Sequence, residues 1–131
     1  MGQAGARTRR RLALGTAVLT AAGLLAVAAP QQQAQAATGC PGRKVRTLTF
    51  ATGSVVVHER GAHVCAVTVP KKPGTKRQMS VSVQARGGRP VVDSGRFAHR
   101  AGPVTVYAGK RCVWVRGAVS GRSVSSGWIL C

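Results

Sequence analysis

The side chains that could do chemistry in this sequence are mostly cations. The chain has twenty Lys and Arg residues and only two acidic residues, Glu59 and Asp93. Groups of cations attract polyanions, and the attraction weakens steeply with salt because counterions are released on binding. Three such groups are close in sequence: Lys71, Lys72, Lys76 and Arg77; Arg43, Lys44 and Arg46; and Lys110 with Arg111.

These groups predict contact with an anionic polymer, for which three classes of ligand are open. The classes are a wall polymer such as teichoic acid, anionic lipid headgroups, and nucleic acid bound without sequence preference. Readout of bases is less favoured, because aromatic residues make up only 4% of the chain and few are present for stacking. The alternative is that the charge serves solubility alone.

The same inventory supports catalysis poorly, and we predict no catalytic residues. A pair of carboxylates for glycoside hydrolysis would need both Glu59 and Asp93. A serine triad could be drawn from Ser94, but Asp93 is its immediate neighbour in sequence and Val92 precedes them where a glycine would free the serine.

A small ribonuclease is a further alternative. His58, Glu59 and either His63 or His99 could act as acid and base, with arginines on the phosphate. His58 and Glu59 alternate along a strand, so only one of them can face a given cleft. His63 and Cys65 lack a second pair of metal ligands, so we predict no metal and no cofactor.

A protease inhibitor is a third class of function. Residues 70–78 form a loop with two prolines and a glycine, and Lys72 or Lys76 could enter the specificity pocket of a trypsin-like enzyme. The simpler interpretation, which we favour, is an ordinary hairpin loop.

Four cysteines predict two disulfides. They are Cys40, Cys65, Cys112 and Cys131, and no two of them form a C-x-x-C motif. Three pairings can be drawn, and we favour the local one, Cys40 with Cys65 and Cys112 with Cys131. A domain of this size buries only about 60–65% of its unfolded surface, so disulfides would add stability that the core lacks.

The elements that must position these residues are strands. Beyond Gly39 we find no helical periodicity, and Met79, Val81, Val83 and Ala85 alternate with polar residues as in a half-buried strand. Turn signals recur about every eight to twelve residues. This pattern predicts an all-β fold, a small antiparallel β-sandwich or barrel of about seven to nine short strands.

The stretch from Val91 to Trp114 is predicted to hold two or three core strands. We expect residues 93–95 (Asp-Ser-Gly) to form a turn in which Asp93 caps neighbouring backbone N–H groups and Gly95 takes a positive φ. Near the end of the chain, alternation places Trp128 and Leu130 on one face.

The N-terminus predicts a helical signal peptide over residues 1–36. Four arginines precede an uncharged run rich in Leu, Ala and Val, and Ala34-Gln35-Ala36 fits the cleavage site. A membrane anchor, a twin-arginine signal and a lipoprotein at Cys40 are weaker alternatives. We therefore expect a secreted, soluble and monomeric domain, residues 37–131, with no membrane span after cleavage.

The central stretch also resembles the small secreted spore-associated proteins of actinobacteria. The resemblance is carried by Asp-Ser-Gly at 93–95 followed by Phe97, by Ala-Gly-Pro-Val at 101–104, by Cys-Val-Trp-Val at 112–115 and by Cys-Ala-Val-Thr at 65–68. It covers about residues 55–131. It implies an exported protein of the spore or cell surface and implies no catalytic residues.

Overall fold

The computed structural model describes residues 39–131, and the predicted signal peptide, residues 1–36, lies outside them. The described part is built of eight strands: β1 (Arg43–Phe50), β2 (Gly53–Arg60), β3 (His63–Pro70), β4 (Arg77–Ala85), β5 (Val91–Phe97), β6 (Ala101–Tyr107), β7 (Val113–Val119) and β8 (Arg122–Ile129). Among these residues no helix has the length and hydropathy of a membrane span.

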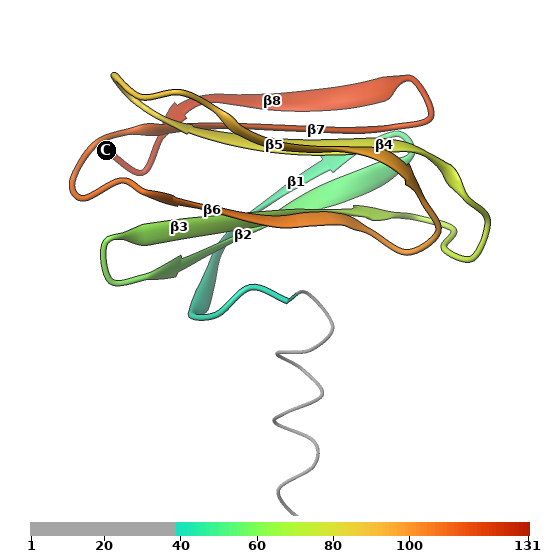
Figure 1. Ribbon diagram of the computed structural model, residues 1–131, viewed down its shortest axis with the longest axis horizontal. Helices are drawn as coiled ribbons and strands as arrows, with labels where there is room; N and C mark the ends of the chain where they lie inside the picture. Colours follow the sequence, from blue (N-terminus) through green and yellow to red (C-terminus); the bar gives the residue numbers. More distant parts are fainter. Residues whose placement is uncertain (1–38) are drawn as a thin grey trace, which may run out of the picture. The chain divides into compact units, whose positions relative to one another are not determined.

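The strands form two four-stranded antiparallel sheets packed face to face (Figure 1). Sheet A has the order β1-β2-β3-β6 and sheet B the order β5-β4-β7-β8. Hairpins join β1 to β2, β2 to β3, β4 to β5 and β7 to β8, whereas three connections cross between the sheets. The prediction of an all-β sandwich is confirmed, including the number of strands.

The core is made mainly of small aliphatic side chains from the inner faces of both sheets. The alternation predicted for residues 79–85 is confirmed, because Met79, Val81 and Val83 are fully buried and Ala85 is nearly so. Each buried valine adds roughly 1.5 kcal/mol or a little more by transfer from water, so such a core is modest. The other fully buried valines and alanines of the core are Val55, Val57, Ala66, Ala101, Val113, Val115 and Val119.

The predicted turn at residues 93–95 is wrong. These residues lie within β5 and pair with β4 (Asp93 opposite Val81, and Gly95 opposite Met79), and Gly95 is not among the glycines with positive φ. The Asp93 side chain does accept a backbone N–H, but from Gly102, nine residues further on, at 2.7 Å. Asp93 therefore ties the edge of sheet B to β6 of sheet A.

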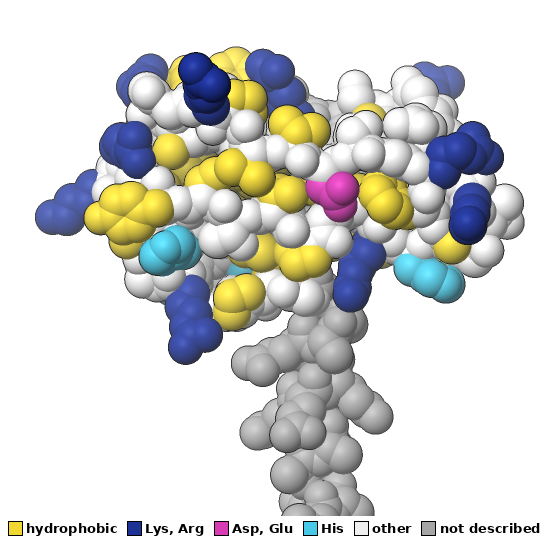
Figure 2. All heavy atoms as spheres, in the orientation of Figure 1, with side chains coloured by type: hydrophobic (Ala, Val, Ile, Leu, Met, Phe, Trp, Pro, Cys, Tyr) yellow, Lys and Arg dark blue, Asp and Glu magenta, His cyan; other side chains and the backbone are white. Residues whose placement is uncertain are grey.

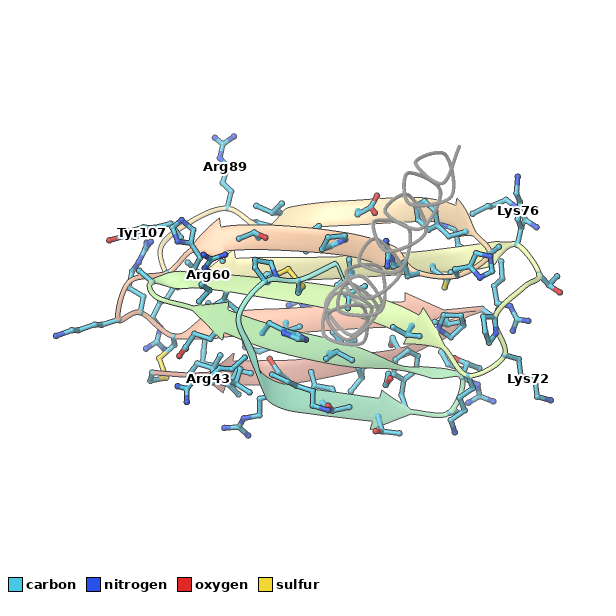
Figure 3. All side chains as sticks on the ribbon, turned by 90° about the horizontal axis from the view of Figure 1, so that it is seen from below. Arg43, Arg60, Lys72, Lys76, Arg89 and Tyr107 are labelled. Atoms are coloured by element: carbon cyan, nitrogen blue, oxygen red, sulfur yellow. A yellow bond between two sulfur atoms is a disulfide. The ribbon has the colours of Figure 1, made fainter. Side chains whose placement is uncertain are left out.

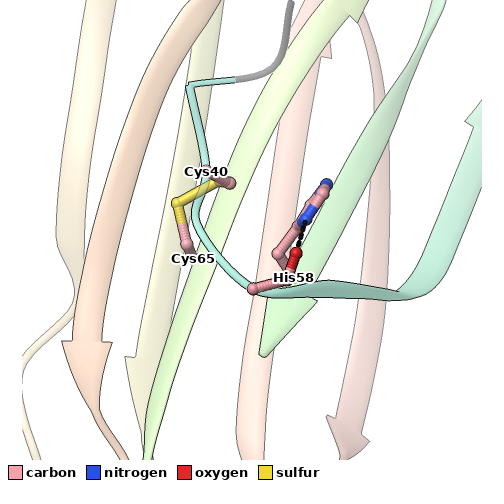
Figure 4. The surroundings of a disulfide bond; sticks show 4 residues. Cys40, His58 and Cys65 are labelled. Carbon is pink, nitrogen blue, oxygen red and sulfur yellow. Dashed lines mark hydrogen bonds between the residues drawn. A yellow bond between two sulfur atoms is a disulfide. The ribbon is translucent and has the colours of Figure 1, made fainter. Parts of the chain in front are cut away.

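The predicted disulfide pairing is confirmed. Cys40–Cys65 joins the segment before β1 to β3, and Cys112–Cys131 joins the segment before β7 to the residue after β8. The first bridge lies on the outer face of sheet A, where Cys40, Cys65 and Val67 form a second buried cluster (Figure 4). Beside it, Nδ1 of His58 lies 3.2 Å from the carbonyl oxygen of Gly42, which fixes the course of the chain into β1.

We predict that both bridges stabilise the fold, and that the first matters more. Closing loops of 25 and 19 residues should each contribute about 3 kcal/mol through the unfolded chain. The pair C40A/C65A also removes packing around Val67, so its free energy of unfolding should fall further than that of C112A/C131A. Urea denaturation of both variants measures this, and equal midpoints for the variants and the parent would contradict it.

The two sheets approach closely at Gly117 on the inner face of β7. A Cβ at this position would collide with Cγ2 of Val55 and lie 2.5 Å from Oγ1 of Thr68. Thr68 is the buried polar residue of the described core, and its hydroxyl has no hydrogen-bond partner there. Glycine is therefore required here by the contact between sheets and not by its backbone angles.

We predict that Gly117→Ala destabilises the protein by about 2 kcal/mol, because overpacking forces the sheets apart. Thermal unfolding measures the effect. Gly88→Ala, in the exposed turn between β4 and β5, is the matched control and should cost much less, since the nearest atom to its Cβ is a single carbonyl oxygen at 3.3 Å. A Gly117→Ala variant as stable as the control would show that the inter-sheet spacing is not a constraint.

Candidate anion-binding site

The two acidic side chains leave most of the predicted cations without an acidic partner, since Arg43 alone among those cations forms an ion pair within residues 39–131. Four of the twenty Lys and Arg residues precede Ala37, so sixteen remain against two acids and the net charge of residues 37–131 is +14. Glu59 pairs with Arg43 at 3.3 Å, in a bridge whose arginine side chain is 79% exposed. Asp93 holds the backbone N–H of Gly102. An exposed pair of this kind contributes little to stability.

Three cations of the first predicted group line a pocket of about 230 Å³. Lys71 and Lys72 follow β3, Arg77 begins β4, and Ala51 and Thr52 complete the wall from the turn between β1 and β2. We call this set of five residues the cationic pocket. The structure thus brings together residues of two loops that are twenty positions apart in sequence.

Two backbone hydrogen bonds and one from a threonine hydroxyl fix the shape of the cationic pocket. The N–H of Lys71 donates to the carbonyl oxygen of Thr52 at 3.0 Å, and the hydroxyl of Thr52 donates to the carbonyl oxygen of Val119 at 2.7 Å. The N–H of Gly74 donates to the carbonyl oxygen of Ala98 at 2.9 Å. The β1–β2 turn and the β5–β6 connection therefore both hold the backbone of the loop that carries the lysines. A ligand would have little of this backbone left to order on binding.

The last member of the first group, Lys76, lies just outside the cationic pocket. Its carbonyl oxygen accepts a hydrogen bond from Arg96 at 3.5 Å, and its side chain projects into solvent at the same end as Lys72 (Figure 3). Arg96, in β5, was not among the predicted residues. Only the pairing of β5 with β4, which sets Arg96 opposite Gln78, brings it to this end.

The third predicted group and Arg43 of the second lie at the opposite end of the sandwich, whereas Arg46 pairs with Val57 in the middle of β1. The N–H groups of Ala108 and Gly109 donate to the carbonyl oxygen of Ala62, so the connection that carries Lys110 packs on the turn between β2 and β3. Arg43, Arg60 and Arg89 lie at this end, away from Lys72 and Lys76 (Figure 3). Figure 2 shows Lys and Arg side chains gathered mostly toward both ends of the molecule, with hydrophobic side chains across the middle.

Arg111 of the third group has a structural role. Its guanidinium donates to the carbonyl oxygens of Ala108 at 3.0 Å, Tyr107 at 2.9 Å and Arg86 at 3.3 Å. Lys110 beside it is exposed and makes no such set of bonds among the described residues. The guanidinium of Arg111 therefore joins the end of β6 and its own connection to the turn that follows β4.

The structure brings together only part of the ribonuclease alternative. The pairing of β2 with β3 sets His58 opposite Cys65 and His63 opposite Arg60, so His58 and His63 share one face of sheet A and lie two register positions apart, whereas Glu59 lies on the other face. His63 begins β3 and packs edge-on against Tyr107, with ring centroids 5.4 Å apart. His99 lies near the other end of the molecule, next to Ala98, and β3 spans roughly 23 Å at about 3.3 Å per residue. The Nε2 atom of His58 is buried and has no partner within residues 39–131.

The triad and metal alternatives are not assembled either. Asp93 and Ser94 point to opposite faces of β5, Asp93 toward Gly102 and Ser94 toward Gln78, whose amide donates to its hydroxyl at 3.4 Å. In the described part of the chain, no three His, Cys, Asp or Glu side chains lie close enough together to hold a metal ion.

The prediction that residues 70–78 form an ordinary hairpin loop is wrong. The segment joins β3 in sheet A to β4 in sheet B, so it crosses between the layers.

Comparisons with family models, with curated proteins and with solved structures found no match to the chain.

We predict that the same loss of charge destabilises the protein at Arg111 but not at Lys110. Arg111→Gln should lower the free energy of unfolding by about 1–2 kcal/mol, since it leaves three carbonyl groups short of a charged donor. Lys110→Gln should leave it within about 0.5 kcal/mol of the parent, as exposed surface changes generally do. Equal urea midpoints for the two variants would mean that the hydrogen bonds of Arg111 carry no stability.

Proposed function

We propose that this protein is a secreted, non-enzymatic protein of the spore or cell envelope that adheres to a phosphate-bearing anionic polymer, and that the cationic pocket holds the phosphate groups. The observation that carries the proposal is the pocket itself. Lys71, Lys72 and Arg77 converge on one braced hollow, while Glu59 and Asp93 are engaged elsewhere. Such a hollow has cationic walls and no internal counter-charge.

The chemistry of the cationic pocket suits a phosphodiester. The guanidinium of Arg77 can make paired hydrogen bonds to phosphate oxygens, and the two lysines act as mobile point charges on either side. Cations at the far end of the sandwich extend the field over a length that a polymer could follow. A linear polyol phosphate, which presents charge without bases or bulky stacking groups, fits these features best.

The location rests on other support. Two disulfides in so small a domain fit an oxidising compartment outside the cytoplasm. The predicted signal peptide and the resemblance to spore-associated proteins add export and the spore or cell surface. Fractionating a sporulating culture into medium, wall and spore coat, with a salt wash of each pellet, tests the location separately from the ligand.

We predict that K71Q/K72Q/R77Q weakens binding to polyglycerol phosphate. The salt dependence should also become shallower, with the negative slope of log affinity against log salt reduced in magnitude by about three. Each phosphate contact that is lost removes about one unit of that slope. The matched control is R60Q/R89Q/K110Q, which removes the same charge from the other end and should change the affinity far less. Binding is measured over a salt series, with duplex DNA as a second probe.

Three outcomes would contradict the proposal. Equal weakening by both triple variants would show attraction by the general field without a site. Tighter binding of duplex DNA than of polyglycerol phosphate would identify the wrong class of polymer. No retention of either probe at low salt would end the adhesion hypothesis.

A further inference from the structure

Both tryptophans of the chain lie on the outer face of sheet B. Trp114 in β7 and Trp128 in β8 are directly opposite each other, and their rings meet edge to face with centroids 5.2 Å apart. Arg86 lies over the ring of Trp128 at 5.0 Å, and Arg116 over that of Trp114 at 5.2 Å. We call these four residues the tryptophan face.

An irregularity in β8 creates this arrangement. Trp114 pairs with Trp128 but Arg116 pairs with Ser125, so β8 holds one residue more than β7 between these pairs. The extra residue is accommodated by Ser126, whose hydroxyl accepts the N–H of Val115 at 2.8 Å and donates to the carbonyl oxygen of Gly127 at 2.6 Å. Opposite residues share a face, so both Trp128 and Ser125 point outward. Bulges of this kind commonly aim a side chain at a functional surface.

A depression of about 300 Å³ adjoins the tryptophan face. Ser125 is common to both, because its hydroxyl accepts the indole N–H of Trp114 at 2.6 Å. Arg116 also belongs to both, and no carboxylate lines the depression. Its remaining lining consists of three serines, Ser80, Ser82 and Ser123, and of small or apolar residues, namely Val81, Gly117, Ala118, Val124 and the exposed Val92.

We infer that the tryptophan face and its depression bind a carboxylate-bearing polysaccharide. An indole ring offers a flat apolar surface on which the C–H face of a sugar can lie, and Trp128 is 36% exposed. Serine hydroxyls both donate to and accept from sugar hydroxyls. Arg116 and Arg86 supply the paired donors that a carboxylate prefers, and the surface offers no carboxylate that would repel it.

This site lies on a different surface from the cationic pocket and takes a different ligand. It stands whether or not the cationic pocket binds polyol phosphates. The two sites share only the sign of their charge, and together they would let one small domain bind two anionic components of an envelope.

Tryptophan fluorescence tests the inference directly, because the chain has no other tryptophan. The probes are oligogalacturonate, its methyl-esterified form, which is the same sugar without charge, and oligothymidylate. We predict a saturable change in emission with oligogalacturonate and an affinity at least about tenfold lower for the esterified form, the difference that one charged pair supplies.

Variants assign the effect to residues. Trp128→Ala should lower the affinity for oligogalacturonate about tenfold, measured by calorimetry, as loss of one stacking platform does. Arg116→Gln should bring the acidic and esterified forms to similar affinities. Tyr107→Ala, which removes an aromatic side chain 63% exposed on sheet A, is the control and should change nothing. K71Q/K72Q/R77Q should keep the fluorescence response.

The inference is overturned if emission does not change with oligogalacturonate, or if the esterified form binds equally well. It is also overturned if oligothymidylate binds more tightly than oligogalacturonate, since the tryptophan face would then stack bases. Should Trp128→Ala fail to fold, Arg116→Gln alone decides the outcome.

Discussion

Residues 37–131 contain sixteen cationic side chains and only two carboxylates, and each carboxylate is engaged in a contact within the fold. Glu59 forms an exposed ion pair with Arg43 at the start of β1, and Asp93 accepts the N–H of Gly102 in β6. The surface therefore has a positive electrostatic field that the protein's own carboxylates do not neutralise. The attraction of the surface for an external polyanion follows from this imbalance.

The fold accommodates that charge with a core of small residues. Valine and alanine fill the space between two closely packed sheets, and Gly117 marks where no side chain fits at all. A core of this kind has little apolar area to offset repulsion among surface cations. The disulfides compensate by restricting the unfolded chain, and Cys40–Cys65 also packs with Val67 outside the main core.

Much of this architecture could be predicted from local sequence, and the limits are instructive. Alternation at residues 79–85 identified a strand correctly, and the short separations of the cysteines suggested their partners. Asp93 was misassigned because Asp-Ser-Gly is a turn signal locally, whereas the pairing of β5 with β4 outweighs it. The prediction that Trp128 and Leu130 share a face is wrong because β8 ends at Ile129 and Leu130 takes a positive φ of 56°, which ends the alternation and lets Leu130 pack against the core. The local pattern of apolar residues reveals the type of secondary structure, but it reveals neither the register between paired strands nor which loops come together.

The central claim is that a braced pocket, rather than charge alone, captures an anionic polymer. Backbone amide NMR spectra of the purified protein, recorded during titration with polyglycerol phosphate, test it most directly. The account predicts that the largest shifts fall on Ala51, Thr52 and residues 71–77, with small shifts at the end that carries Lys110. Shifts spread over both ends in proportion to the exposure of their cations would contradict it.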